Sequence, residues 1–293
     1  MLNTFFKYLE YEKRYSKHTL LSYENDLKQF KSFLENQSQL HDLLKAEHRH
    51  IRAWVVQLMQ EGIKPKSINR KIVSLRTFYK FAILREAIQQ NPTQKIKALK
   101  VSKDLPQFVQ EKEMDNLLNL LEFPDDFEGS RDALIMELLY GTGIRLAELL
   151  NLKYSDFNLS SKTIRILGKG NKERIIPFHA KILERLNNYI SHKNKMFIGN
   201  EAGPLIVSIN GNDAYPMMIN RITKKYLNQV TTISKTSPHV LRHTFATHLL
   251  NKGADLNAVK DLLGHSSLAA TQVYTHNSLD KLKKVFDQAH PKA

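Results

Sequence analysis

The sequence predicts a mainly α-helical protein of two domains, and three features support this fold class. Apolar residues recur at intervals of three and four along several stretches, which is the spacing of an amphipathic helix. Near residue 91 this periodicity stops in a stretch rich in proline and lysine. Two short β-rich runs around a glycine-containing turn predict a small hairpin or sheet. With 293 residues, 42% of them hydrophobic, the chain is long enough for well-buried cores.

Two amphipathic helices are predicted in the first domain, which we assign to residues 1–91. The first covers residues 19–34 and carries the apolar positions Leu20, Tyr23, Leu27, Phe30 and Leu34. The second covers residues 65–84, and its expected buried stripe is Ile68, Ile72, Leu75, Tyr79 and Ala82. Its other face carries Lys66, Arg70, Lys71 and Arg76. These basic residues are candidates for DNA contact, although a solvated helix face has the same pattern.

Residues 92–107 are predicted to form an extended basic linker, because prolines and lysines occur there without a sustained period. The second domain, residues 108–293, begins with helices expected over residues 111–121 and 130–143, the latter ending at glycines. Two strands are expected at residues 163–167 and 173–178, around the turn sequence GKGNK. Beyond Lys181 the pattern is mainly helical, and only residues 199–216 predict no clear element.

The charge of the chain favours a polyanionic partner. Lys and Arg number 44 against 29 Asp and Glu, a net charge of +15. The excess is concentrated in residues 1–105, which hold 20 basic and 10 acidic side chains. The chain has no cysteine, which excludes disulfides, thiolate catalysis and Cys-based zinc sites. No apolar run predicts a membrane span or a signal peptide, so we expect a cytoplasmic protein without membrane association.

Two kinds of phosphate or metal site can be set aside. The sequence GKGNK lacks the spacing of a phosphate-binding G-x-x-x-x-G-K-[ST] loop, so nucleotide hydrolysis has no support. His239 and His243 are four residues apart, as zinc-binding histidines often are, but no carboxylate lies between them. We therefore predict no metal and no cofactor.

Four pieces of the second domain carry candidate site residues and resemble the motifs of one family. They are TGIRLAELLNL, GKGNKERIIPF, HVLRHTFATHLL and LGHSSLAATQVYTH. In their order and spacing they resemble the tyrosine recombinases, whose H-x-x-R, His/Trp and Tyr pattern matches His239, Arg242, His265 and Tyr274. The first domain and the linker resemble those of the Xer-type members, so the resemblance covers nearly the whole chain. It implies two domains that close around DNA: a helical SAM-like core-binding domain and a catalytic domain.

The resemblance implies a role for each candidate residue. Tyr274 would be the nucleophile that forms a 3′-phosphotyrosine, which conserves the energy of the broken DNA bond. Arg145 and Arg242 would bind the non-bridging phosphate oxygens through their planar, permanently charged groups. Lys169 would protonate the leaving 5′ oxygen; its neighbour Lys172 is a candidate DNA contact instead.

Two histidines and a glutamate complete the implied site. His239 would assist proton transfer at the tyrosine hydroxyl, and His265 would donate a hydrogen bond to the phosphate. Glu148 would orient Arg145 from one helical turn away.

The implied activity is site-specific recombination, with chromosome-dimer resolution as the leading cellular role. Integration or excision of a mobile element is the rival; a type IB-like topoisomerase and a non-catalytic DNA-binding module also remain open. A terminal helix is expected at about residues 278–290, and it either packs on its own domain or docks into an adjacent subunit. The expected partners are double-stranded DNA, further copies in a homotetramer or a paralogous recombinase in a hetero-tetramer, and an activating DNA translocase.

Overall fold

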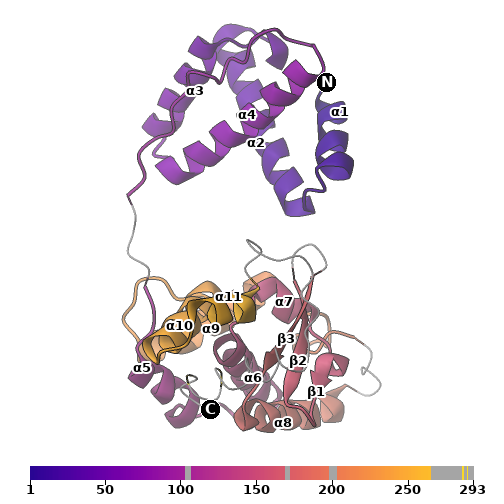
Figure 1. Ribbon diagram of the computed structural model, residues 1–293, viewed down its shortest axis with the longest axis vertical. Coiled ribbons are helices and arrows are strands. Elements are labelled where there is room, and N and C mark those ends of the chain that lie inside the picture. Colours follow the sequence, from indigo (N-terminus) through magenta and orange to yellow (C-terminus); the bar gives the residue numbers. More distant parts are fainter. Residues whose placement is uncertain (103–106, 169–171, 198–202, 265–285, 287–288, 290–293) are drawn as a thin grey trace. The chain divides into compact units, whose positions relative to one another are not determined.

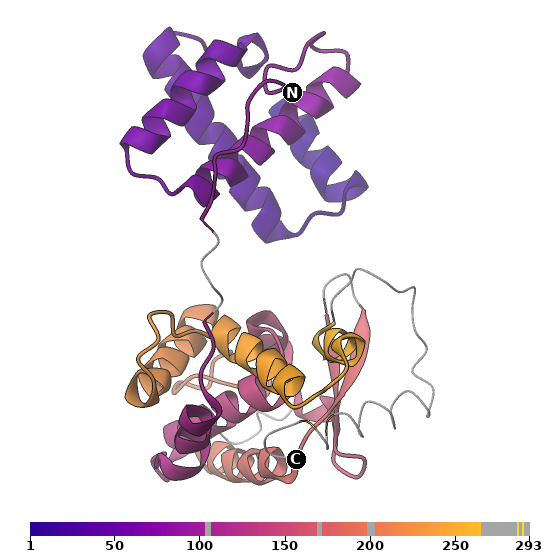
Figure 2. The same ribbon diagram turned by 60° about the vertical axis from the view of Figure 1, so that its left-hand side comes forward.

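A computed structural model describes residues 1–102, 107–168, 172–197, 203–264, 286 and 289 of the chain (Figures 1 and 2). The chain divides into two compact units, Met1–Asp104 and Leu105–Ala293. Each has a hydrophobic core of its own. No helix among the described residues is both long and apolar enough to cross a membrane.

All regular elements among the described residues of the first unit are helices or helical turns. Its elements are α1 (Leu2–Lys7), the π-helical turn η1 (Tyr8–Glu12), α2 (Lys17–Ser38), the 3-10 turn η2 (Leu43–Lys45), α3 (His48–Gln60) and α4 (Pro65–Leu84). Both predicted helices are confirmed. The hydroxyl of Ser16 accepts a hydrogen bond from the Thr19 amide and so caps α2, while Pro65 occupies the first turn of α4.

The core of the first unit lies between α2, α3 and α4. All five residues of the predicted α4 stripe are buried, as are Leu27, Phe30 and Leu34 of α2. Trp54 of α3 lies against Phe30, with ring centroids 5.0 Å apart. The 3.6-residue period of these helices therefore brings their apolar faces together in one core.

The segment predicted as a linker begins by packing on the first unit. Ile96 is buried in its core. The side-chain amide of Asn69 donates to the Leu99 carbonyl at 2.9 Å and accepts from the Leu99 amide at 2.8 Å. The first unit therefore extends past residue 91. Asn69 of α4 satisfies the backbone hydrogen bonds of Leu99, in a segment that has no helical period of its own.

The second unit is mainly helical with a small sheet. Its helices are α5 (Glu111–Asp115), the π-helical turn η3 (Asn116–Leu120), α6 (Phe127–Thr142), α7 (Leu146–Asn151), the 3-10 turn η4 (Tyr154–Asp156), α8 (Ala180–Met196), α9 (Pro216–Val230), α10 (Pro238–Asn251) and α11 (Leu256–Leu263). The sheet consists of β1 (Phe157–Asn158), β2 (Thr163–Leu167) and β3 (Glu173–Pro177), antiparallel in that order. The predicted fold class is thereby confirmed.

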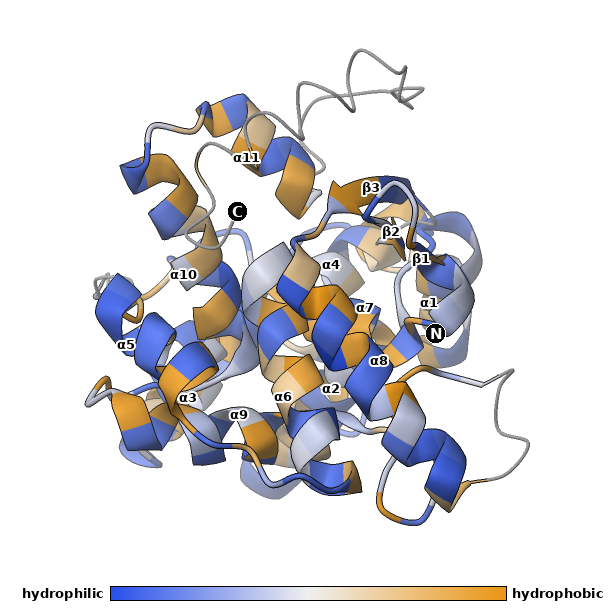
Figure 3. Cartoon of the chain, turned by 90° about the horizontal axis from the view of Figure 1, so that it is seen from below, coloured by the Kyte–Doolittle hydropathy of each residue, from blue (hydrophilic) through white to orange (hydrophobic). Residues whose placement is uncertain are grey.

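Helix α6 forms the centre of this unit. Every residue from Phe127 to Thr142 except Glu128 is buried, and the helix packs against α8 and α10. Asp126 caps its start by accepting from the Gly129 amide at 2.7 Å. By contrast, α8 carries separate hydrophobic and hydrophilic bands (Figure 3), and it buries Ile182, Leu186 and Tyr189. The neighbouring helices thus cover α6 over almost its whole length.

The two longer strands of the sheet form the predicted hairpin. Ile164 lies opposite Ile176, and Leu167 lies opposite Glu173. At its turn end the Gly168 amide donates to the Lys172 carbonyl at 2.8 Å, and the turn residues between them lie outside the described part of the chain. Strand β3 contacts α11, beside which it runs in Figure 2. This contact brings the hairpin to the end of α11.

Candidate active site

Arg145 is held at the junction between α6 and α7. Helix α6 ends at Gly143, whose φ of 60° is the left-handed conformation that glycine adopts without strain. Two residues later, Arg145 caps α7: its amide donates to Glu148 Oε2 at 2.8 Å and its Nη1 to Glu148 Oε1 at 2.9 Å. The side chain of Arg145 remains 38% exposed. It therefore has a fixed orientation and an open side.

Arg242 reaches the same place from α10. Its Nη1 donates to the Gly143 carbonyl and its Nη2 to the Leu263 carbonyl, the latter at 2.6 Å. The residue is 7% exposed. Burial, with the nearby charge of Arg145, lowers the pKa of Arg242 to about 10, so the guanidinium remains charged at neutral pH. The two arginines predicted to act together thus lie at one site, although 97 residues separate them in the sequence.

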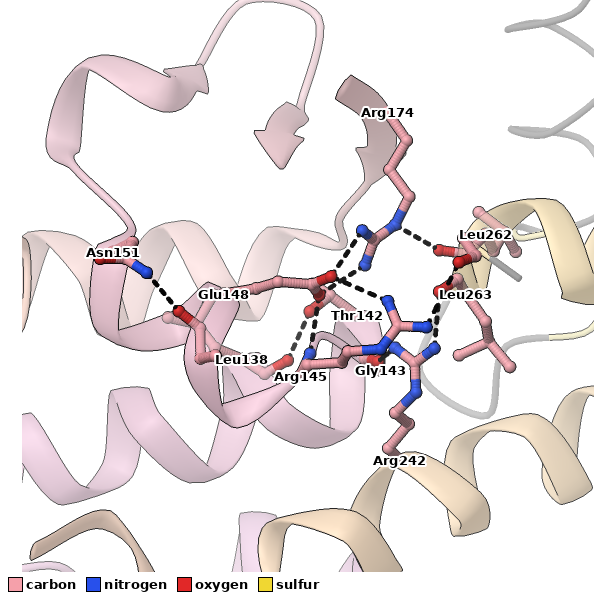
Figure 4. Close-up of polar contacts among 12 residues, drawn as sticks. Leu138, Thr142, Gly143, Arg145, Glu148, Asn151, Arg174, Arg242, Leu262 and Leu263 are labelled. Atoms are coloured by element: carbon pink, nitrogen blue, oxygen red, sulfur yellow. Dashed lines mark hydrogen bonds and ion pairs between the residues drawn. The ribbon is translucent and has the colours of Figure 1, made fainter. Parts of the chain in front are cut away.

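The end of α11 is where three arginines converge (Figure 4). Three consecutive carbonyl groups each accept from a different guanidinium: Leu262 from Arg174 at 2.9 Å, Leu263 from Arg242, and Gly264 from Arg145 at 3.3 Å. The last carbonyls of a helix lack partners within the helix and carry partial negative charge. They can therefore hold cations in place before an anionic ligand binds.

Glu148 connects two of the arginines. Its side chain is 5% exposed, and it accepts from both terminal nitrogens of Arg174, at 2.9 and 2.7 Å, as well as from Arg145. Burial alone would raise its pKa, but the hydrogen bonds and charge of Arg174, aided by Arg145, lower the pKa of Glu148 to about 2. Three guanidinium groups thus surround a single ionised carboxylate. The local charge is positive, which favours binding of an anion such as a phosphodiester.

An open cavity of about 770 Å³ lies beside this cluster, and Arg145, His239, Arg242 and His243 line part of it. His239 is exposed near the start of α10, while His243 lies one turn further and is half-buried. Burial, with the neighbouring His239, lowers the pKa of His243. Among the described residues, no group of three or more histidines or carboxylates is arranged to hold a metal ion.

The structure brings together four of the seven predicted residues of the catalytic domain, Arg145, Glu148, His239 and Arg242. The other three, Lys169, His265 and Tyr274, lie outside the described residues. Lys172 is exposed at the turn end of the hairpin.

Arg174 belongs to the described arginine cluster, and the sequence did not predict it. It lies in a β-strand among apolar residues, and a single arginine in a strand gives no signal of its partners. These are Glu148 and Leu262, which are 26 and 88 residues away.

The basic residues predicted on α4 have unequal surroundings. Lys66 is exposed. Arg70 has a half-exposed side chain and binds both carboxylate oxygens of Asp26, a residue of α2 that is 1% exposed. Arg76 is half-buried and donates to the Ile96 carbonyl.

The prediction that Lys71 lies on the exposed basic face of α4 is wrong. Its side chain is 9% exposed and lies 3.1 Å from Asp26, whose buried carboxylate draws it inward. Helical spacing alone could not show this, because Asp26 lies on another helix.

Comparison with known proteins identifies the family. The model of the phage integrase family matches residues 107–280, and that of the phage integrase N-terminal SAM-like domain matches residues 2–86. The tyrosine recombinase XerC of Staphylococcus carnosus is 41% identical over 99% of this chain and 97% of its own length. That of Chlorobaculum parvum is 36% identical over 100% of this chain and 94% of its own.

A solved structure has the same fold. The crystal structure of the XerH site-specific recombinase bound to a palindromic difH substrate aligns with a TM-score of 0.72 and 21% identity, covering 97% of this chain and 83% of the other. The two family models together span both units, and the relatives are similar over the whole length of the chain. This chain therefore belongs to the phage integrase family and is a tyrosine recombinase of the Xer type.

Proposed function

We propose that the protein is a site-specific DNA recombinase that cuts and rejoins duplex DNA through a covalent 3′-phosphotyrosine. The observation that carries this proposal is the convergence of Arg145 and Arg242 on one open cavity that His239 also lines. A pentacoordinate phosphorus gathers negative charge on its non-bridging oxygens, and two planar guanidinium groups can stabilise that charge with charge-assisted hydrogen bonds. Because carbonyl groups hold both arginines in place beforehand, little reorganisation is needed when DNA binds.

Tyr274 is our proposed nucleophile. A tyrosine hydroxyl must lose its proton as it attacks, and we propose that His239, which lines the cavity, assists that transfer. The new bond joins the tyrosine oxygen to phosphorus, and the bond from phosphorus to the 5′ oxygen breaks. Lys169 donates the proton that the 5′ oxygen takes up, and His265 donates a hydrogen bond to the phosphate. Reversal of these steps on an exchanged strand reseals the DNA without ATP.

Glu148 acts through Arg145 in this scheme. It fixes both the amide and Nη1 of Arg145, while Nη2 donates to the Gly264 carbonyl; the N–H groups that remain are available to phosphate. In the first unit, Lys66 and Arg70 are the better supported DNA contacts, since both are exposed. Lys172 is exposed beside the hairpin turn and suits the same use. We propose that the two units close around duplex DNA as a clamp.

Assembly follows from the same reasoning. Recombination between two sites needs four active protomers, either identical or paired with a paralogous recombinase, and an activating DNA translocase fits the Xer type. Burial of Phe286 and Ala289 in the core of the second unit favours packing of the proposed terminal helix on its own domain when the protein is alone. Docking of residues 278–290 into an adjacent subunit would then require the tail to leave that core.

The cellular role that we propose is resolution of chromosome dimers in the cytoplasm. Full-length similarity to XerC proteins supports it over integration or excision of a mobile element. A cognate site can be found by selecting, from a randomised pool of nicked duplexes, the DNA that becomes covalently attached to the protein.

Trapping on a nicked suicide duplex tests the proposed function. A nick next to the cleavage position lets a short fragment diffuse away, so cleavage leaves a stable protein–DNA adduct. We expect the adduct with the natural chain and none with Tyr274→Phe, while gel-shift affinity stays nearly the same. An adduct that forms equally with Tyr274→Phe would disprove the nucleophile. Relaxation of supercoiled DNA that lacks the site would instead identify a topoisomerase.

A further inference from the structure

We propose that Arg174 is a positioning residue for the cleavage reaction: it fixes the β2–β3 hairpin and the end of α11 to Glu148 and so sets the general acid against the arginine pair. This inference rests on the proposed function, because it takes Lys169 as that acid. Arg174 touches no reacting atom in this account, and its effect passes through the neighbours that it holds.

All three nitrogens of the planar Arg174 guanidinium donate hydrogen bonds. Nη1 and Nη2 bind the two oxygens of Glu148, and Nε binds the Leu262 carbonyl at 2.9 Å. The side chain is 5% exposed. One residue of β3 thus connects the hairpin to α7 and to α11. A lysine could keep the charge but could not make these three bonds together.

Two glycines lie directly against Arg174. A Cβ atom on Gly264, which has a φ of 65°, would be 3.1 Å from Arg174 Cδ. A Cβ atom on Gly168 would be 3.5 Å from Arg174 Nη1, 3.6 Å from Glu148 Oε1 and 3.3 Å from the Lys172 carbonyl. In the sequence, Gly168 immediately precedes Lys169, and Gly264 immediately precedes His265. The chain therefore enters both catalytic segments from points that Arg174 contacts.

A role in stability alone explains this arrangement poorly. Replacing a buried ion pair by apolar side chains of similar volume is often neutral or stabilising, so such a pair is weak evidence for a stabilising function. What the pair does supply is orientation, because a bidentate arginine–carboxylate contact fixes both groups in one plane. Its location also favours positioning, since Glu148 binds Arg145 with the same carboxylate.

The test uses a substrate that does not need the acid. When the bridging 5′ oxygen of the scissile phosphate is replaced by sulfur, the group that leaves is a thiolate. A thiol has a pKa of about 8.5, so the thiolate departs without protonation. With the ordinary substrate, we expect Arg174→Lys to cleave about 10²-fold more slowly than the natural chain at saturating DNA, because a displacement of about 1 Å costs that much. With the sulfur substrate, its rate should return to within about tenfold of the natural chain.

Three further variants make the result interpretable. Lys169→Ala is the reference for loss of the acid and should be rescued by sulfur as well. Arg165→Lys is the matched control: its side chain lies on the same hairpin but is 57% exposed, and it should cleave both substrates at the natural rate. Gly168→Ala keeps every charge; its new Cβ atom would lie 3.3 Å from the Lys172 carbonyl and within van der Waals contact of Arg174 Nη1, so it should show a smaller, sulfur-rescued loss. If circular dichroism shows that Arg174→Lys does not fold, Gly168→Ala takes its place as the test variant.

The outcomes separate this inference from the proposed function. Rescue of both Lys169→Ala and Arg174→Lys supports the two together. Rescue of Lys169→Ala without rescue of Arg174→Lys or Gly168→Ala overturns the positioning role and leaves the acid in place. If sulfur fails to rescue Lys169→Ala, the assignment of the acid is wrong and the positioning role falls with it. Ordinary cleavage by Arg174→Lys at the natural rate would also overturn it.

Discussion

Replacing Glu148 with glutamine tests whether the buried carboxylate holds the arginine cluster together. The change keeps the size of the side chain but leaves the buried Arg174 without its counter-charge. The pKa of Glu148 falls from its ordinary value of 4.5 to about 2 in the folded protein. At about 1.4 kcal/mol per pKa unit, the ionised carboxylate stabilises the folded state by about 3 kcal/mol. Removing one partner of a buried ion pair generally costs about 3–5 kcal/mol, which agrees with the value obtained from the pKa of Glu148.

The pH dependence has a definite sign. Because the pKa is lowered on folding, the contribution is complete above pH 4.5 and is lost as the pH falls through 2. Glu148→Gln should therefore lower the free energy of unfolding of the second unit by about 3 kcal/mol at pH 7, and by only about 1 kcal/mol at pH 3.

Urea unfolding followed by far-UV circular dichroism measures this difference. The sole tryptophan, Trp54, is buried in the first unit, so its fluorescence marks the unfolding of that unit, which should not change. Glu173→Gln is the control: its side chain is 58% exposed and lies 4.0 Å from Arg165, so less than about 1 kcal/mol should be lost. A second-unit transition for Glu148→Gln within 1 kcal/mol of the natural chain at pH 7 would refute the reasoning.

Three further changes test other parts of the structure. Arg242→Lys should reduce adduct formation by about 10²-fold or more with little change in gel-shift affinity, because lysine lacks the planar fork; a natural rate of cleavage would contradict this. Asp26→Asn should destabilise the first unit by about 3 kcal/mol, since Arg70 and Lys71 lose their shared carboxylate; an unchanged Trp54 fluorescence transition would count against it. Gly143→Ala should destabilise the second unit by about 2 kcal/mol or more, because the new Cβ atom would lie 2.4 Å from Phe245 Cδ1 at a φ of 60°. Gly253→Ala is its control: φ is 85°, nothing lies within 4 Å, and circular dichroism should show only a backbone cost of about 1 kcal/mol.

The sequence was sufficient where structure depends on local pattern. The period of α2 and α4 predicted their buried stripes, and the glycines after α6 predicted where that helix ends. The β-rich runs around the glycine turn predicted the two paired strands β2 and β3. The resemblance of the motifs to those of tyrosine recombinases also implied that Arg145 and Arg242 act together, and the structure places both on the carbonyl groups at the end of α11.

The sequence was insufficient where a charged residue depends on a distant partner. Lys71 has the helical position of an exposed residue, but Asp26 of another helix draws it inside. Arg174 resembles any polar residue of a short strand until β3, α7 and α11 come together around it. Ile96 and Leu99 belong to an aperiodic stretch, and only Asn69 and the first core reveal that they pack. In each case, tertiary contacts decide what local pattern leaves open.

Mapping the trapped adduct measures the central claim most directly. The protein captured on its suicide duplex is digested with protease and nuclease, and the peptide that retains a nucleotide is sequenced by mass spectrometry. We expect the nucleotide on Tyr274, joined through its 3′ phosphate. A nucleotide on any other residue, or one joined through its 5′ phosphate, would contradict the account.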